Sequence, residues 1–573
     1  MRRRVLLLLL AVVLVALGVA GWSGWRALQV RSDLTAAQAT VTQLQAQLKA
    51  GQVSEAEAAL PGLRTRLDRA AGRTGGPVWT VAEHLPVLGR NLHVVRRIAQ
   101  AAQALGDRAL PEATAALHLV RGGALLRDGR VDLTVLEQLR GHVQLATQAA
   151  DRAQALLAPG DEPLLATVRS KLTEARLKVV DLDRQLRSAQ TALDVAPAML
   201  GQGGRRHYFV AVQNNAEARA TGGLVGAFAL VTADHGKITL DRTGTDTELR
   251  VADKPVPSDP AAAQFWKDEG STQAWYDVNL TPHFPDAAQN LAGQWTAQSG
   301  QRLDGVIALD PIVMSELLTA TGPVTLPDGT AVSASSVVDF VGHDEYVRYT
   351  DVPKRKALLG TLAADLFHRV IAAGDGFRTL QAFARAGSSG HLFLWSAHPT
   401  DQARLAATLV GGTLPTQDSP YLSVLTQNYG GDKLDFYVRR SVRVTRQRDG
   451  RLQLTVVLRN TAPLGLPDYM TVRSDNPSPP LPYGQAKVGL TVYGALSSEI
   501  GQVKVDGRQA LMSFDHDHGH LLGTLNLELP RGKDVTVTLL LTEPRGVLVY
   551  RQQPLVIPDT LALDLSHVLV GRH

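Results

Sequence analysis

The polar segment 213–223 holds the residues best suited to bind a ligand, and it follows an apolar run that is typical of a buried strand. An arginine can make a bidentate contact with phosphate, asparagine supplies neutral donors, and paired glycines let a ligand approach the backbone closely. The candidate ligand-binding residues of this segment are Asn214, Asn215, Glu217, Arg219, Thr221, Gly222 and Gly223. The alternative is a polar loop whose asparagines and glycines only satisfy turn geometry.

No catalytic motif accompanies this segment. The Gly-Lys-Ser/Thr of a P-loop, the Gly-x-Ser-x-Gly elbow, the His-Glu-x-x-His motif and the dinucleotide fingerprint do not occur. The chain has no cysteine, which excludes disulfides, iron–sulfur clusters, thiol catalysis and cysteine-ligated zinc. We therefore assign no reaction, cofactor or catalytic residue from the sequence.

Two further patterns, one rich in histidine and one acidic, are candidate sites. In the tract 515–520, three histidines alternate with other residues, so on a strand they could converge on a metal ion. The glycine within the tract and the strand-like runs beside it favour an exposed hairpin tip instead. Asp304 and Asp310 flank an apolar strand, and their spacing places them at its opposite ends, which excludes a local acid–base pair.

The N-terminus predicts a membrane segment. Three arginines precede the uncharged apolar run 5–22, which is at the short end of what spans a hydrocarbon layer of about 30 Å. Cations before the run predict a cytoplasmic N-terminus and an extracytoplasmic body. A cleaved signal peptide is the alternative, because small residues at 18–20 offer a cleavage site. We expect residues 1–25 to form a transmembrane signal anchor, and the protein to be a single-pass protein of the cell membrane.

Residues 26–200 are predicted to form a helical stalk or bundle without strands. Two stretches repeat apolar residues with the 4, 3 spacing of a coiled-coil seam, and we expect them to pack together. They comprise Val30, Leu34, Ala37, Val41, Leu44 and Leu48, and Val168, Leu172, Ala175, Val179, Leu182, Leu186, Ala189 and Leu193. A spacer role is the simpler interpretation, and self-association through the stalk is the other.

The remainder predicts two further domains, so the expected fold class is multidomain α+β. Residues 201–412 are expected to form an α/β domain. Residues 413–573 are expected to form a β-sandwich, because short alternating strands are separated by Gly, Pro, Asn and Asp. The clearest strands are predicted at 434–444, 452–458, 486–493, 501–505, 521–529 and 534–541. The net charge of +5 over 573 residues is too small to indicate a nucleic-acid partner.

The segment 208–240, with its core Asn-Asn-Ala-Glu-Ala-Arg-Ala-Thr-Gly-Gly, resembles the bacterial family called domain of unknown function 4012. Further matching pieces are Asn-Leu-Thr-Pro-His-Phe-Pro at 279–285, the strand and its flanks at 303–311, Asn-Tyr-Gly-Gly-Asp-Lys at 428–433, and Arg-Asn-Thr-Ala-Pro at 459–463 with Pro467 and Tyr469. The resemblance covers roughly residues 205–475. It implies an anchored bacterial envelope protein and brings no established reaction.

The order of elements also resembles, more loosely, the LytR–CpsA–Psr glycopolymer ligases. In those ligases arginines hold a polyprenyl pyrophosphate and aspartates hold magnesium. The resemblance implies a similar central domain with Arg219, Arg348 and Arg355 as ligand-binding residues. This chain has asparagines at 214–215, where the first aspartate is expected, and a glycine near the second, so neither the metal nor the ligase activity is carried over.

The sequence thus predicts an extracytoplasmic envelope protein that binds a phosphate-linked glycopolymer or a polyprenyl-pyrophosphate carrier, with transfer of that ligand as the stronger form of the hypothesis. The alternative is a noncatalytic envelope scaffold or interaction protein. The expected partners are the membrane, through one N-terminal span, and an envelope glycan or lipid carrier. Convergence of Arg219, Arg348 and Arg355 on one cleft is the structural feature that separates the two hypotheses.

Overall fold

The computed structural model describes residues 2–49, 52–86, 88–121, 125–158, 163–373, 376–472, 482–565 and 571–572. The chain divides into two compact units. Unit 1 consists of Met1–Leu125 and Asp132–Pro197, and unit 2 consists of Leu126–Val131 and Ala198–His573. The α/β region and the C-terminal β region, predicted as separate domains, therefore belong to one unit.

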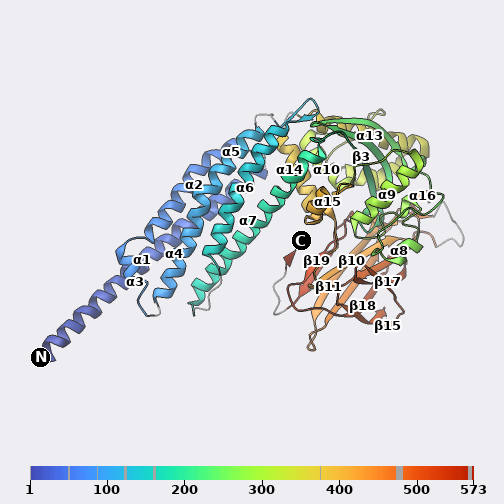
Figure 1. The fold of residues 1–573 in the computed structure, drawn as a ribbon. Coiled ribbons are helices and arrows are strands. Elements are labelled where there is room, and N and C mark those ends of the chain that lie inside the picture. The colour runs from blue at the N-terminus through green and yellow to red at the C-terminus, as the bar shows by residue number, and fades with distance from the viewer. Residues whose placement is uncertain are drawn as a thin grey trace. The chain divides into compact units, whose positions relative to one another are not determined.

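Unit 1 is a bundle of helices (Figure 1). Its helices are α1 (Arg2–Lys49), α2 (Val53–Arg73), α3 (Pro77–Ala82), α4 (Leu88–Ala104), the π-helical turn η1 (Leu105–Ala109), α5 (Leu110–Arg121), α6 (Leu133–Leu156) and α7, which begins in this unit (Ala166–Met199). Asp132 caps α6, because its carboxylate accepts hydrogen bonds from the first free backbone N–H groups of that helix.

Each heptad seam is partly buried, with Val41 40% exposed, and each packs against other helices of the bundle. Ala37 and Leu44 of α1 form a cluster with Leu63 of α2, whereas Leu172 and Val179 of α7 pack against residues of α4 and α6. The predicted long coiled-coil stalk, with its two stretches paired, is therefore wrong. A seam with a period of 3.5 residues can be covered by several short neighbouring helices as well as by one long partner.

The structure also contradicts the predicted transmembrane anchor. Residues 2–25 lie at the start of α1, and none of the helices among the described residues has an apolar stretch long enough to cross a membrane. The side chains of residues 2–18, which hold most of the apolar run, lie outside the described residues. Further along α1, Val30 is 1% exposed and packs against other helices, which gives that part of the helix the character of a bundle helix. The prediction that the protein is a single-pass protein of the cell membrane is wrong for the same reason.

The first part of unit 2 contains a seven-stranded sheet. In spatial order its strands are β1 (Leu126–Arg127), β2 (Arg130–Val131), β5 (Lys237–Thr245), β4 (Gly222–Asp234), β3 (Arg206–Arg219), β6 (Gly305–Leu309) and β9 (Phe393–Ser396). Only β3 and β6 pair in parallel. Because β1 and β2 form a hairpin on its edge, the prediction that residues 26–200 are helical throughout is wrong.

Helices cover both faces of this sheet, because alternate residues of its central strands point to opposite faces. Val306 and Ala308 of β6 pack in a cluster with α9 (Phe284–Ser299). Ile307 and Leu309 pack on the other side, against a cluster from α10 (Pro311–Thr321), α13 (Val352–Ile371) and α14 (Gly376–Ser388). The remaining elements of this region are η2 (Asp246–Glu248), α8 (Gln264–Asp268), η3 (Trp275–Asp277), β7 (Val324–Thr325), β8 (Ala331–Val332), α11 (Val337–Asp339), η4 (Phe340–Asp344), α12 (Glu345–Arg348), α15 (Pro399–Ala406) and η5 (Leu409–Gly411).

The second part of unit 2 has two six-stranded sheets. One contains β16 (Ser513–Asp517), β17 (His520–Leu529), β13 (Ala486–Tyr493), β10 (Tyr421–Asn428), β19 (Val549–Arg551) and β21 (Gly571–Arg572). The other contains β15 (Arg508–Gln509), β14 (Glu499–Val505), β18 (Asp534–Thr542), β12 (Leu452–Asn460), β11 (Val438–Arg446) and β20 (Thr560–Asp564). Two short helices, η6 (Leu434–Tyr437) and α16 (Asp468–Thr471), flank these strands.

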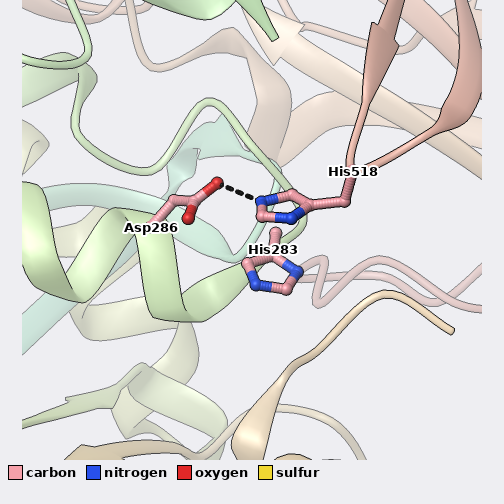
Figure 2. A group of neighbouring side chains, drawn as sticks. All are labelled: His283, Asp286 and His518. Atoms are coloured by element: carbon pink, nitrogen blue, oxygen red, sulfur yellow. Dashed lines mark hydrogen bonds and ion pairs between the residues drawn. The ribbon is translucent and has the colours of Figure 1, made fainter. Parts of the chain in front are cut away.

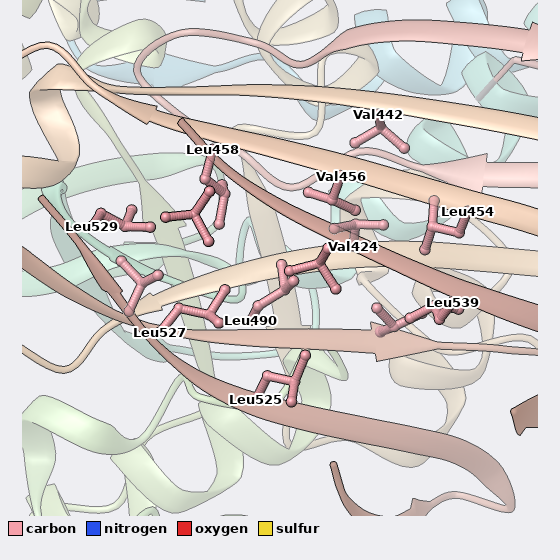
Figure 3. Close-up of a cluster of buried hydrophobic side chains, with 14 of the residues drawn as sticks. Val424, Val442, Leu454, Val456, Leu458, Leu490, Leu525, Leu527, Leu529 and Leu539 are labelled. Carbon is pink, nitrogen blue, oxygen red and sulfur yellow. The ribbon is translucent and has the colours of Figure 1, made fainter. Parts of the chain in front are cut away.

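The two sheets share one apolar core (Figure 3). Leu454, Val456 and Leu458 of β12 face Leu490 of β13 and Leu527 of β17. Along β12 the buried positions alternate with more exposed ones, which is the pattern that predicted strands in this region. The strand predicted at 486–493 has the observed bounds of β13, whereas the first part of 434–444 forms the helical turn η6.

Candidate functional site

The predicted polar loop at 213–223 is part of a long β-hairpin. Strand β3 continues to Arg219 and β4 begins at Gly222, so only two residues form the turn. Two irregularities in the β3–β4 register, at 212/213 and 214/218, accommodate the extra residues. The segment stays in strands because the β-sandwich supplies partners for its polar backbone groups. For example, the Ala218 N–H donates to Asp435 and Gln553 donates to the Arg219 carbonyl.

Arg219 is buried in an ion-pair network at this end of the hairpin. Its Nη2 atom lies 3.3 Å from a Glu217 carboxylate oxygen and 3.6 Å from one of Asp277. Its other N–H groups donate to the carbonyls of Tyr276, Ala218 and Asn428. The Arg219 side chain is only 6% exposed, so its guanidinium group is directed to acceptors of the protein itself.

Glu217 joins this network to the next loop by pairing with Lys433. Burial opposes ionisation of Glu217, but Lys433 and Arg219 outweigh it and hold the pKa of the carboxyl below its usual value. Asp435, whose carboxylate accepts the Ala218 N–H, has its pKa raised to about 7 by burial and by Asp432. Glu217 and Lys433 are therefore charged at neutral pH, whereas Asp435 is partly protonated.

The two asparagines have structural hydrogen bonds. Asn214 donates to the Val341 carbonyl at 3.2 Å and to the Tyr346 hydroxyl at 2.7 Å. Asn215 donates to Asp310 at 2.8 Å and to the Pro554 carbonyl at 2.8 Å. Both side chains thereby connect the hairpin to neighbouring elements.

The hairpin turn leaves little space for side chains. A Cβ atom on Gly223 would lie 1.9 Å from the Asn214 carbonyl oxygen, so only glycine fits there. Gly222 has a φ of 132°, which strongly favours glycine. Thr221 is fully buried, and its hydroxyl has no hydrogen-bond partner among the described residues. The glycines therefore serve close packing of the hairpin rather than approach of a ligand from solvent.

The three arginines named above do not share one cleft. Arg348 has a side chain that is 52% exposed and pairs with Asp344 one helical turn away. Arg355, at the start of α13, is 2% exposed and is the one of the three that lines a cleft. Convergence of Arg219, Arg348 and Arg355 is therefore not observed.

The cleft beside Arg355, here called the Arg355 cleft, lies between the hairpin, α10, η4, α12, α13 and α16. It is narrow, with about 60 Å³ open to the centres of water molecules, enough for a few waters. Its apolar lining includes Val212, Leu224, Met314, Val341, Leu359 and Ala363. Its polar lining is Gln213, Asn214, Asp246, Glu345, Tyr346, Arg355, Lys356, Lys433 and Tyr469.

Aromatic rings hold the guanidinium group of Arg355 in place. Its Cζ atom lies 4.8 Å from the ring centre of Tyr346 and 4.1 Å from that of Tyr469, and these rings stack on each other. Its Nη1 atom donates to the Tyr349 carbonyl at 3.2 Å. Its Nη2 atom is buried and has no hydrogen-bond partner among the described residues. A cationic donor is thus fixed in the cleft with unused hydrogen-bonding capacity.

Several cleft residues were not identified as site residues from the sequence. Glu345 and Tyr346 lay in a segment without a recognised motif, although both border the arginine at 348. Lys433 and Tyr469 were noted only as parts of the family resemblance. Their proximity depends on the packing of the sandwich against the α/β region, which no local pattern reveals.

The hairpin tip in the tract 515–520 is docked rather than exposed. His518 lies at the turn between β16 and β17 with a φ of 51°, and its backbone N–H donates to the Ala261 carbonyl. Its Nε2 atom forms a hydrogen bond of 2.8 Å with a carboxylate oxygen of Asp286 in α9 (Figure 2). Its ring also stacks on that of His283, with ring centres 3.9 Å apart. The neighbouring His520 is buried and contacts two backbone carbonyls instead, so the three histidines of the tract do not converge.

His283, Asp286 and His518 each offer one atom that could bind a metal ion, and these three atoms lie within 4.8 Å of one another. Two features oppose coordination in this arrangement. Nδ1 of His283 accepts the Leu414 N–H at 3.1 Å, so a neutral ring carries its proton on Nε2. The two imidazole planes are stacked with an angle of 20°, so no nearby point lies in both planes, as coordination by ring nitrogens requires. We assign this cluster to docking of the hairpin tip.

Comparison with known proteins gives one match. Residues 203–346 match the model of the family described as "Protein of unknown function (DUF4012)". No curated protein and no solved structure matches the chain. The matched segment starts where the resemblance predicted and ends at residue 346, short of the predicted 475. It runs from β3 to α12 and therefore includes one wall of the Arg355 cleft. Residues 203–346 are therefore similar to the DUF4012 family.

Proposed function

We propose that the Arg355 cleft binds a phosphate-bearing ligand, of the class to which phosphate-linked glycopolymers and polyprenyl-pyrophosphate carriers belong. The observation that carries the proposal is the buried Nη2 atom of Arg355, which lacks a partner among the described residues. A buried cationic N–H without an acceptor is costly, and a phosphate oxygen is an acceptor that guanidinium groups prefer.

The charges around the cleft support an anionic ligand. Lys356 is paired with Asp246, and Lys433 is paired with Glu217. Burial raises the pKa of the remaining carboxyl group, Glu345, to about 8, so it is mostly uncharged at pH 7. Of the three cationic side chains that line the cleft, Arg355 is therefore the one that does not pair with an ionised carboxylate among the described residues. One phosphate group would supply the missing negative charge.

The lining of the cleft supports a ligand that also carries an apolar or sugar part. Val212, Leu224 and Met314 provide apolar surface beside the guanidinium group. Gln213 contributes a buried side-chain oxygen that has no hydrogen-bond partner among the described residues and can accept from a ligand hydroxyl. Because the cleft is narrow, the phosphate and its immediate neighbours are the part of the ligand that it would hold.

The second candidate function is a noncatalytic scaffold, and the Arg219 network favours it. Arg219, Glu217 and Lys433 connect the hairpin with the loop that enters the β-sandwich. A ligand is not needed to explain these residues, because each has a partner within the protein. Under this hypothesis the Arg355 cleft contains water and no ligand.

Calorimetric titration of the full chain separates the two functions. The ligands are geranyl diphosphate, which represents the lipid carrier, and UDP-glucose, which represents a phosphate-linked sugar. Binding of both indicates recognition of the shared pyrophosphate, and binding of one identifies the source of the ligand. We expect Arg355→Met to weaken binding about ten- to a hundredfold, since a charged hydrogen bond contributes ~1.5–3 kcal/mol.

The matched control is Arg348→Met. Arg348 lies seven residues earlier, is half exposed and does not line the cleft, so its replacement should leave the affinity unchanged. Circular dichroism and melting of each variant establish that it is folded. The proposal is contradicted if neither ligand binds at millimolar concentration, or if the two variants bind as well as each other.

A further inference from the structure

Glu345 is the second unpartnered charged-type side chain of the Arg355 cleft. It is 1% exposed, and apart from a weak side-chain interaction with Tyr346 its carboxyl oxygens have no hydrogen-bond partner among the described residues. The other two carboxyl groups near the cleft, Asp246 and Glu217, each pair with a lysine. Buried polar groups are normally satisfied, and Glu345 and Arg355 both line this cleft, so a ligand bound there would supply partners for the carboxyl group and for the Nη2 atom.

The surroundings of Glu345 decide its protonation. Burial raises the pKa of this carboxyl to about 8, and Arg355, a side-chain hydrogen bond with Tyr346 and Lys433 only partly oppose the effect. Asp246 adds a small increase. Tyr346, the next residue, lies on the same short helix α12 and is itself buried, so it keeps its phenolic proton. The cleft thus favours a neutral carboxylic acid, which has one O–H donor, beside a permanent cation.

We infer that Glu345 contacts the ligand directly, as a protonated carboxyl group that donates a hydrogen bond to a phosphate oxygen held by Arg355. This inference rests on the proposed function. An ionised Glu345 would repel the phosphate, whereas its protonated form supplies the donor that complements a second phosphate oxygen. The residue therefore selects ligands that accept hydrogen bonds at two adjacent anionic oxygens.

The inference makes ligand binding and proton uptake inseparable at alkaline pH. When the carboxyl group of the free protein is ionised, binding requires Glu345–COO⁻ to take one proton from solvent and become Glu345–COOH. The proton remains on the carboxyl group, and no bond of the ligand breaks. The affinity should then fall about tenfold per pH unit once the carboxyl of the free protein is ionised.

The test is calorimetric titration of the full chain with geranyl diphosphate between pH 7.5 and 9.5, in pairs of buffers that differ in ionisation enthalpy. The pair of heats at each pH gives the number of protons taken up per ligand. For the wild-type chain we expect uptake to approach one proton at pH 9.5. Glu345→Gln keeps a hydrogen-bond donor that does not titrate, so it should bind with little pH dependence and no proton uptake. Glu499→Gln, at an exposed position of β14, is the matched control and should behave as wild type.

The outcomes separate this inference from the proposed function. Wild-type binding that Arg355→Met weakens, but that shows no proton uptake and no pH dependence, overturns the role of Glu345 and leaves the proposed function intact. Absence of binding at every pH removes the proposed function and the inference with it. If Glu345→Gln fails to fold, proton uptake by the wild-type chain alone decides the question.

Discussion

Glu345→Gln is expected to stabilise unit 2 at neutral pH. In the folded chain the carboxyl group of Glu345 has a pKa of about 8, whereas the ordinary value is 4.5. Between these values the folded chain keeps a proton that the unfolded chain has lost, so the free energy of unfolding falls as the pH rises. At roughly 1.4 kcal/mol per pH unit, the loss from pH 4.5 to pH 7 is about 3 kcal/mol. Glutamine does not titrate and avoids this loss.

The pH dependence gives the prediction its sign. Well below pH 4.5 the wild type and Glu345→Gln should have similar stability, because the carboxyl group is protonated in both folded and unfolded wild type. The difference should grow up to about pH 8 and then stay constant, since above that value both states of the wild type are ionised. Few glutamate replacements behave in this way, because most carboxylates stabilise the folded state when ionised.

The assay must report on unit 2 alone, because the chain has two units and need not unfold in one step. Hydrogen–deuterium exchange of peptides from β6 and α13, measured by mass spectrometry in increasing urea, provides such a local signal. Glu499→Gln is again the control and should match the wild type at each pH. Equal stability of wild type and Glu345→Gln at pH 7.5, or a less stable variant, would refute the reasoning from desolvation.

Three further predictions concern the hairpin and its surroundings. Arg219→Ala should lower the free energy of unfolding by about 3–5 kcal/mol in urea denaturation, because it removes the buried cation that pairs with Glu217 and Asp277; an unchanged midpoint would show that the network carries no such energy. Gly223→Ala should lower the melting temperature by several degrees or prevent folding, as its Cβ would overlap the Asn214 carbonyl; a melting curve like that of wild type would contradict this. Burial lowers the pKa of His518, but Asp286 raises it by more, so the pKa in the folded chain lies above the ordinary 6.5. The ion pair of His518 with Asp286 should therefore stabilise the fold fully below pH 6.5, and this stabilisation should be lost as the pH rises through the pKa of His518 in the folded chain. After division by the intrinsic, base-catalysed exchange rate, the protection of peptide 513–520 should be lower at pH 8.5 than at pH 6 in the wild type and should not change in His518→Gln; equal changes in protection in the two chains would count against this.

Secondary-structure elements with a short-period residue pattern could be predicted from the sequence. Alternation of apolar and polar residues located strands β12, β13 and β18 to within one or two residues. The same reasoning placed Asp304 and Asp310 at opposite ends of β6, where each serves a different partner. Asp304 accepts from the His207 N–H, and Asp310 caps α10. Local periodicity is sufficient for such features because it depends only on which face of an element is buried.

Long-range partners were not predictable in the same way. In the heptad stretch that includes Leu44, Ala37 and Leu44 are buried whereas Val41 is 40% exposed, and the pattern did not reveal which helices would cover the buried positions. The apolar run at the N-terminus satisfied the length and charge rules for a membrane span, yet the helices of the described residues do not support that prediction. A residue pattern identifies an apolar surface that must be buried, but it does not identify the element that packs against it.

The candidate site shows the same division. Arg355 and Asn214 were predicted as ligand-binding residues, and both line the cleft. Arg219 was also predicted, but Glu217 and Asp277 bind it inside the protein. An arginine among asparagines and glycines has the same local sequence whether its acceptor is a ligand or a carboxylate distant in the chain. Only the tertiary structure distinguishes the two cases.

The most direct measurement of the central claim is a crystal structure of the chain with geranyl diphosphate bound at pH 7. Our account predicts electron density for the pyrophosphate in the Arg355 cleft, with one oxygen within hydrogen-bond distance of Arg355 Nη2 and another beside the Glu345 carboxyl group. Pyrophosphate bound at another place, or a cleft that contains only ordered water at saturating ligand, would contradict it.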